Sequence, residues 1–322
     1  MAPAVLFEGL SAFPPTPADM DGKVSEEALS RLLERIRVAR ADSIGLLGST
    51  GAYAFLSRGE RRRAVETAVE CVGGRVPLIV GVGALRTDEA QALARDAKAA
   101  GADGLLLAPV SYTPLTEEEV YQHFVAVAGA SDLPLCIYNN PGTTKFVFSE
   151  ELIVRLSQVP NIAAVKMPLP ADGDFEGEIA RLRANTSAAF AIGYSGDWGA
   201  ADALLSGADA WFSVVGGLLP APASKLARAS KAGDRAEAHR IDMAFQPLWA
   251  LFKEFGSFRV MYAIGSILNL FQALPPRPIL PLGPGDRAPA WSAQKVTPRT
   301  PPFNRIFTLQ ALNLHGELLM RQ

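Results

Sequence analysis

The stretch Gly101-Ala102-Asp103-Gly104-Leu105-Leu106-Leu107-Ala108 decides the fold of this chain. It joins the end of a helical pattern, where Gly101 can take the left-handed conformation of a helix stop, to a short apolar run typical of a buried strand. The same corner recurs as Gly207-Ala208-Asp209, and in the shorter form Ala41-Asp42. Repeated corners of this kind predict alternating helices and parallel strands joined by right-handed crossovers.

Eight apolar runs follow this scheme, and helical patterns separate them. The predicted strands are 5–7 with 10–13, 43–47, 76–82, 104–108, 133–138, 162–166, 189–193 and 210–215. The predicted helices are 25–40, 57–71, 87–100, 116–128, 149–159, 175–183 and 198–205, with capping-box sequences at Ser57 and Thr116. Eight units favour a closed (β/α)8 barrel over an open doubly wound sheet. The first strand is not followed by a Gly-x-Gly-x-x-Gly motif, which weakens the dinucleotide-binding alternative.

The alternation stops near Pro220, which predicts three parts in the chain. Residues 1–222 are expected to form the barrel and residues 223–283 a C-terminal helical segment, whereas residues 284–322 are a poorly patterned tail. Helices are expected over 221–232, 235–255 and 257–271, and the tail contains one strand-like piece, 307–312. The fold class is therefore α/β, a TIM barrel with a C-terminal helical extension.

The composition of the 322 residues argues against several classes of protein. A net charge of −2 gives no basic footprint for nucleic acid. Neither a membrane span of about 18 apolar residues nor a signal peptide is evident, so a cytoplasmic protein without membrane contact is expected. Cys71 and Cys136 are expected to be small core residues rather than a disulfide. No metal-ligand cluster or phosphate loop is found, so neither a metal nor another cofactor is expected, and a flavin or phosphate barrel has little support.

The run Ile162-Ala163-Ala164-Val165-Lys166 places a lysine at the end of the sixth predicted strand. On its own such a lysine is better explained as a strand end whose head reaches solvent. An amine buried without an acidic partner, in contrast, favours its neutral form and attacks carbonyl groups. The other strand ends decide between these interpretations.

The active site of a (β/α)8 barrel lies where the strands end. The polar residues and glycines expected there are Ser49, Thr50, Ser111, Tyr112, Tyr138, Asn139, Asn140, Lys166, Gly193, Tyr194 and Ser195. They form a set of hydroxyls around one amine, with no acid, and His123, His239 and His315 are expected at the surface instead. An amine that forms an imine with a keto acid, next to a tyrosine that moves protons, fits this set. Each motif alone has an ordinary structural explanation, and only their placement at one end of the barrel favours chemistry.

Three motifs together resemble the dihydrodipicolinate synthase / N-acetylneuraminate lyase family. They are Gly48-Ser49-Thr50-Gly51, Tyr138-Asn139-Asn140-Pro141 and the strand-end lysine, and the resemblance spans residues 5–283. It implies a Schiff-base lyase that handles pyruvate or another 2-keto acid, usually as a tetramer built from two dimers. The implied catalytic residues are Lys166 for the imine, Tyr138 as general acid/base, Ser49 as relay and Tyr112 as a second tyrosine given to the neighbouring subunit. The implied substrate contacts are Thr50, Gly51, Thr143, Gly193 and the main chain of Phe212.

The chain departs from the family pattern around the second substrate. The synthase branch has an arginine shortly after its Tyr-Asn-x-Pro motif, and Thr143 takes that position here, so a bidentate carboxylate partner is lost. Ala52 replaces a glutamate, and Met167-Pro168 replace polar residues. These changes favour an aldolase or dehydratase for a 2-keto-3-deoxy sugar acid over the lysine-pathway enzyme. The alternative is a keto-acid-binding or regulatory protein that keeps the scaffold without turnover.

Overall fold

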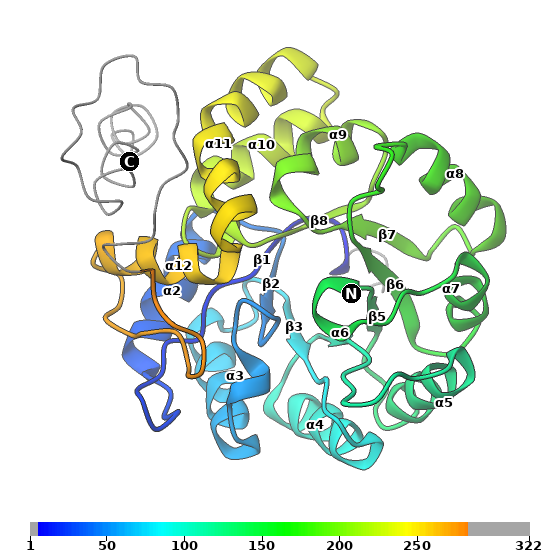
Figure 1. The fold of residues 1–322 in the computed structure, drawn as a ribbon, viewed down its shortest axis with the longest axis horizontal. Coiled ribbons are helices and arrows are strands. Elements are labelled where there is room, and N and C mark those ends of the chain that lie inside the picture. Colours follow the sequence, from blue (N-terminus) through cyan, green and yellow to red (C-terminus); the bar gives the residue numbers. More distant parts are fainter. Residues whose placement is uncertain (1–5, 283–322) are drawn as a thin grey trace.

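A closed barrel of eight parallel strands forms the centre of the computed structural model, which describes residues 6–282 (Figure 1). The strands are β1 Gly9–Ala12, β2 Ser43–Leu46, β3 Leu78–Gly81, β4 Gly104–Leu107, β5 Leu135–Tyr138, β6 Ile162–Met167, β7 Ala191–Tyr194 and β8 Ala210–Ser213. Each strand pairs with the next in sequence, and β8 closes on β1. Almost every strand residue is buried, because helices cover the barrel from outside while side chains fill its interior. The predicted (β/α)8 barrel is confirmed.

The helices surround the strands as an outer ring (Figure 1). They are α2 Glu26–Val38, α3 Arg58–Val72, α4 Thr87–Ala100, α5 Glu117–Ala128, α7 Glu150–Ser157, α8 Phe175–Asn185, α9 Ala200–Leu205 and α10 Pro220–Lys231. The short helix α6, Pro141–Thr144, was not predicted, and α11 Arg235–Phe255 and α12 Ser257–Ile267 follow the ring. Short 3-10 turns at Tyr53–Phe55, Asp197–Gly199 and Val215–Gly217 follow β2, β7 and β8. The expected strand-like piece 307–312 and His315 lie outside the described residues.

The three aspartate corners tie a strand to its neighbour at three places in the barrel. Before β4, the Asp103 N–H donates to the carbonyl of Leu78 at 2.9 Å, and the Asp103 carboxylate accepts from the Leu78 N–H at 2.8 Å. The same pair of bonds recurs between Asp42 and Leu10 and between Asp209 and Ile192. The carboxylate therefore satisfies a backbone donor at the start of the neighbouring strand, where no ladder partner is in reach.

The two predicted capping boxes have different outcomes. Thr116 and Glu119 exchange both bonds of the box at the start of α5, as predicted. Ser57 caps α3, but the prediction of a complete box there is wrong. The Glu60 carboxylate accepts instead from the N–H of Val24, at 2.7 Å, and so holds the loop before α2 against α3.

His123 corrects the expectation of surface histidines. It is buried between α4 and α5, and its Nδ1 lies 2.9 Å from the Thr87 hydroxyl. Burial lowers the pKa of His123, so the neutral ring is favoured at physiological pH. His239 is exposed, as predicted.

Both cysteines are free: Cys136 is buried, as expected of a core residue, while Cys71 is half-buried. Across residues 6–282, no helix combines the length and the apolar character that a membrane crossing requires.

Candidate active site

One rung of the barrel ladder carries the centre of the site. Tyr138 on β5 pairs with Lys166 on β6, and Lys166 pairs with Gly193 on β7. Residues directly opposite in neighbouring strands present their side chains on the same face of the sheet. Lys166 is only 4% exposed, so its amine is held inside the barrel mouth. A Cβ atom at Gly193 would lie 2.6 Å from the ring of Phe212, which explains the glycine beside the lysine.

Three aromatic rings enclose the Lys166 amine. Its Nζ atom lies 3.9 Å from the centroid of Phe13, 4.1 Å from that of Tyr138 and 5.5 Å from that of Phe212. Phe13 and Phe212 contact each other edge to face. Among the described residues, no carboxylate forms an ion pair with this amine within 4.0 Å. The faces of these rings attract a cation, and burial removes the amine from water. Tyr138 is the one member of this cage with a hydroxyl, and so the one that can move a proton.

The Tyr138 hydroxyl belongs to a cluster that reaches the β2 loop. It accepts a hydrogen bond from the Asn140 amide at 2.9 Å and lies 3.4 Å from the Ser49 hydroxyl. Asn140 also donates to Ser49, at 3.5 Å. The structure thus brings Ser49 and Tyr138 together as predicted, and it adds Asn140 as the residue that orients both hydroxyls. These polar groups connect the Tyr138 hydroxyl with the loop after β2.

The Gly-Ser-Thr-Gly turn is fixed by its neighbours. The Ala52 N–H donates to the Ser49 carbonyl at 3.1 Å, and Thr50 is buried. Leu47 and Ala52, on either side of the turn, both have a φ of 56°, a left-handed conformation that costs energy without glycine. A Cβ at Gly51 would lie 2.9 Å from the Leu47 main chain. The strained turn therefore holds its backbone and the Thr50 side chain in one conformation.

Asp197 corrects the expectation that no acid belongs to this end of the barrel. It follows β7, is buried, and accepts bonds from Trp211 Nε1 at 2.9 Å, from Val214 N at 3.1 Å and from Val215 N at 2.6 Å. Burial raises the pKa of Asp197 to about 6, against the opposing effect of its hydrogen bonds and of the nearby Lys166 charge. The carboxylate therefore fixes the loop after β8 behind the amine cage.

The Asp197→Asn variant should lose stability. An amide has one acceptor oxygen and directs an N–H group toward the buried donors that the carboxylate now satisfies. We expect the free energy of unfolding to fall by roughly 1–3 kcal/mol, the cost of buried unsatisfied donors. Thermal unfolding measures the change. Asp202→Asn is the matched control, since Asp202 is exposed nearby on α9, and it should leave the midpoint unchanged. Equal midpoints for both variants would contradict the role of Asp197.

Two of the predicted site residues lie away from the amine in the same chain. Tyr112 is 95% exposed, and among residues 6–282 no hydrogen bond joins it to Tyr138. Thr143 is exposed on α6, where its hydroxyl donates to the Asn140 carbonyl at 3.3 Å. Phe13 was not predicted as a site residue. It directly follows β1, and the rule that the active site lies at the ends of the strands would have identified it. Within the described part of the chain, no group of three or more His, Cys, Asp or Glu could hold a metal ion.

Comparison with known proteins gives consistent results. The family model described as the Dihydrodipicolinate synthetase family matches residues 6–287. A 4-hydroxy-tetrahydrodipicolinate synthase from Methylococcus capsulatus is 38% identical over 251 residues, which are 77% of this chain and 84% of that protein.

Solved structures agree with the fold. A dihydrodipicolinate synthase from Agrobacterium tumefaciens superposes with a TM-score of 0.86 at 64% identity, covering 87% of this chain and 95% of that one. A chloride-inhibited dihydrodipicolinate synthase from Acinetobacter baumannii, solved in complex with pyruvate, has a TM-score of 0.79 at 30% identity, covering 86% and 94% of the two chains.

Proposed function

This chain belongs to the dihydrodipicolinate synthetase family, whose members are lyases of the class I aldolase type, and from that premise we propose that its Lys166 forms a Schiff base with pyruvate or a related 2-keto acid. The observation that carries the proposal is the buried amine between three rings, on the same rung of the ladder as Tyr138. Burial keeps water from competing for the amine, and the ladder fixes its distance from the proton carrier.

The side chains at the site account for each proton in imine formation. The Lys166 nitrogen attacks the keto carbon, and the carbinolamine then loses its oxygen as water. Two protons leave the nitrogen while the oxygen gains two, so the net charge does not change. Tyr138 carries these protons, and the Asn140 amide that donates to its oxygen would stabilise the phenolate between transfers. The imine then draws electrons from the neighbouring carbon, where a C–C bond forms or breaks.

The turn after β2 is the proposed site for the keto-acid carboxylate. Thr50 supplies a buried hydroxyl, and Gly51 allows the main chain to approach closely. Gly193 and Phe212 close the opposite wall. Such a clamp orients the keto carbon toward the amine. We also propose that copies of the chain assemble, with the exposed Tyr112 reaching a neighbouring copy.

The substrate beyond the keto acid depends on the wall after β6. Leu169 follows β6 and packs against Gly196 and Gly199, so this wall is apolar. Together with Thr143 at the mouth, it favours a 2-keto-3-deoxy sugar acid or a related substrate over aspartate semialdehyde. The relatives named 4-hydroxy-tetrahydrodipicolinate synthase support the second candidate, condensation of pyruvate with aspartate semialdehyde. Rates with both substrates and with N-acetylneuraminate decide between the candidates.

Reductive trapping tests the proposed function directly. The protein is incubated with pyruvate and borohydride, and the modified peptide is identified by mass spectrometry. We expect one adduct, on Lys166, while the seven other lysines serve as internal controls. An unmodified Lys166 would refute the Schiff-base proposal. An adduct without turnover on any substrate of the panel would support the keto-acid-binding alternative.

A further inference from the structure

The side chain of Asn140 is turned away from the helix that it begins. Asn140 is the N-cap residue of α6, a position where asparagine normally accepts a hydrogen bond from a main-chain N–H of the first turn. The Asn140 side chain makes no such bond. A Cβ at Gly142 would lie 3.7 Å from the side-chain oxygen of Asn140, so this oxygen faces α6, while the nitrogen faces the hydroxyls of Tyr138 and Ser49. The usual cap is therefore absent, and the amide makes its contacts elsewhere.

The Asn140 amide donates to both hydroxyls of the site. Its nitrogen lies 2.9 Å from the Tyr138 oxygen and 3.5 Å from the Ser49 oxygen, and these two oxygens are 3.4 Å apart. An amide NH2 group can only donate, so it occupies one acceptor position on each oxygen. One hydroxyl hydrogen can then bridge the two oxygens, and the other remains free for a substrate. The amide thus limits the directions in which the two hydroxyls can donate.

Two threonines of α6 fix the main chain of Asn140. The N–H groups of Thr143 and Thr144 both donate to the Asn140 carbonyl, each at 3.0 Å. The hydroxyls of the same two residues donate to that oxygen as well, at 3.3 Å and 3.0 Å. Since Tyr138 ends β5 and Asn140 follows it by two residues, α6 holds the amide against the end of the strand that carries the phenol.

We propose that Asn140 is a positioning residue of the reaction, and that α6 serves the proton carrier through it. The proposal rests on the Schiff-base function proposed above. When Tyr138 gives its proton to the carbinolamine oxygen, the phenolate left behind accepts from the Asn140 amide, and a proton from the Lys166 nitrogen then restores the phenol. Thr143, which the family resemblance places at the substrate, thus holds Asn140 in this chain. α6 therefore acts on the pyruvate half of the reaction, before a second substrate binds.

The Asn140→Asp variant separates this role from helix capping. Aspartate caps a helix as well as asparagine does, but its carboxylate cannot donate and repels an ionised phenol. Exchange of the pyruvate C3 hydrogens with deuterium, followed by NMR, measures imine–enamine interconversion without a second substrate. We expect the maximal exchange rate to fall by at least ~10-fold, the effect of one hydrogen bond to a charged group, while the pyruvate concentration for half saturation changes less than about twofold. Relative to the natural protein, the rate should recover at low pH, because a protonated carboxyl group donates again.

Two further variants test the amide and its anchor separately. Asn140→Leu has a similar size but no polar atoms, so it should slow exchange less than Asn140→Asp does. The double variant Thr143→Val and Thr144→Val removes the two hydroxyl donors to the Asn140 carbonyl, and it should slow exchange by at least ~3-fold. A helix that contacted only the second substrate would leave pyruvate exchange unchanged.

Asn161→Asp is the matched control. The Asn161 amide donates to the carbonyls of Ala128 and Ser131 before β6, at the opposite end of the barrel, so this variant should leave exchange unchanged. Natural exchange rates in Asn140→Asp or in Asn140→Leu would overturn the proposal and leave Asn140 a structural role only. Borohydride should still trap pyruvate on Lys166 in the Asn140 variants, which shows that they are folded. Failure to trap pyruvate on the natural protein would instead refute the Schiff-base function, a separate result.

Discussion

The Lys166→Met variant is expected to form no pyruvate adduct and to lose turnover by a factor of at least ~10³, because no other group can form the imine. The amine is the only part of the side chain that the reaction uses. Methionine matches most of the length of the lysine stem and keeps the apolar contacts with Phe13 and Phe212 that surround Nζ. Borohydride trapping and turnover with the substrate panel measure the loss.

The same variant should not be less stable than the natural protein. Lys166 is buried without an ion-pair partner in the described part of the chain, so folding carries the cost of desolvating its amine. Methionine removes that cost, and the free energy of unfolding should stay equal or rise by roughly 1–3 kcal/mol. Loss of activity with an equal or higher unfolding midpoint identifies a functional residue retained at the expense of stability.

An exposed lysine on the same side of the barrel provides the control. Lys145 follows α6, and its amine donates to the Gly142 carbonyl at 3.1 Å. Lys145→Met should leave both the adduct and the turnover unchanged. A pyruvate adduct that persists in the Lys166→Met variant, on Lys145 or on any other lysine, would contradict the assignment.

Tyr138→Phe is expected to have the second-largest effect. It keeps the ring 4.1 Å from the Lys166 amine but removes the oxygen that accepts from Asn140 and neighbours Ser49. The rate of C3 hydrogen exchange in pyruvate should fall by ~10²–10⁴-fold, the range for a general acid–base group. The half-saturating pyruvate concentration should change little, because the proposed carboxylate contacts remain.

Tyr194→Phe separates this effect from the general loss of a buried hydroxyl. Tyr194 ends β7, and its hydroxyl donates to Glu178 on α8 at 2.6 Å. Its removal should cost stability but leave the exchange rate within a few-fold of the natural protein. Similar exchange rates in the two variants would show that Tyr138 is not the proton carrier.

The fold could be predicted because its determinants are local. Each buried parallel strand is a short apolar run, and three corners repeat an aspartate whose bonds to the neighbouring strand are now evident. Lys166, Tyr138 and Ser49 could be placed together by one rule, since residues at the carboxyl ends of parallel strands meet at one end of a barrel. Their roles in the reaction remain a prediction.

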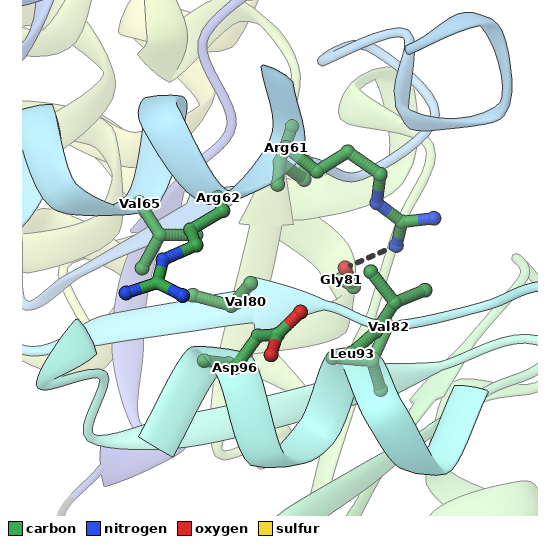
Figure 2. Close-up of a pocket in the computed structure, with 10 residues that line it drawn as sticks. Arg61, Arg62, Val65, Val80, Gly81, Val82, Leu93 and Asp96 are labelled. Atoms are coloured by element: carbon green, nitrogen blue, oxygen red, sulfur yellow. Dashed lines mark hydrogen bonds between the residues drawn. The ribbon is translucent and has the colours of Figure 1, made fainter. Parts of the chain in front are cut away.

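The remaining structure around the site depends on side chains that form hydrogen bonds with residues distant in the sequence. Asp197 lies three residues beyond β7 and turns back to the main chain after β8. Arg61 comes from a helix and reaches the carbonyls at the end of β3 across the α3–β3 packing (Figure 2). Glu60, on the same helix, does not accept from the N–H of Ser57 as expected of a capping box; it accepts from the N–H of Val24 instead. Neither apolar periodicity nor residue type specifies such long-range partners, so the sequence alone could not provide them.

Tyr138, Lys166 and Gly193 lie on one rung of the strand ladder. The residues of the proposed reaction therefore depend on the strands, whereas the choice of second substrate depends on the loops. Main-chain pairing aligns the proposed nucleophile and the proposed proton carrier, and side-chain changes in the loops leave this pairing intact. A one-residue insertion in β5 or β6 would turn them to opposite faces and end the reaction. The loops after β4 and β5, in contrast, can change length and composition without moving the amine. In proteins that keep this rung, changes in a single loop can therefore alter the second substrate, while the proposed imine formation at Lys166 is preserved.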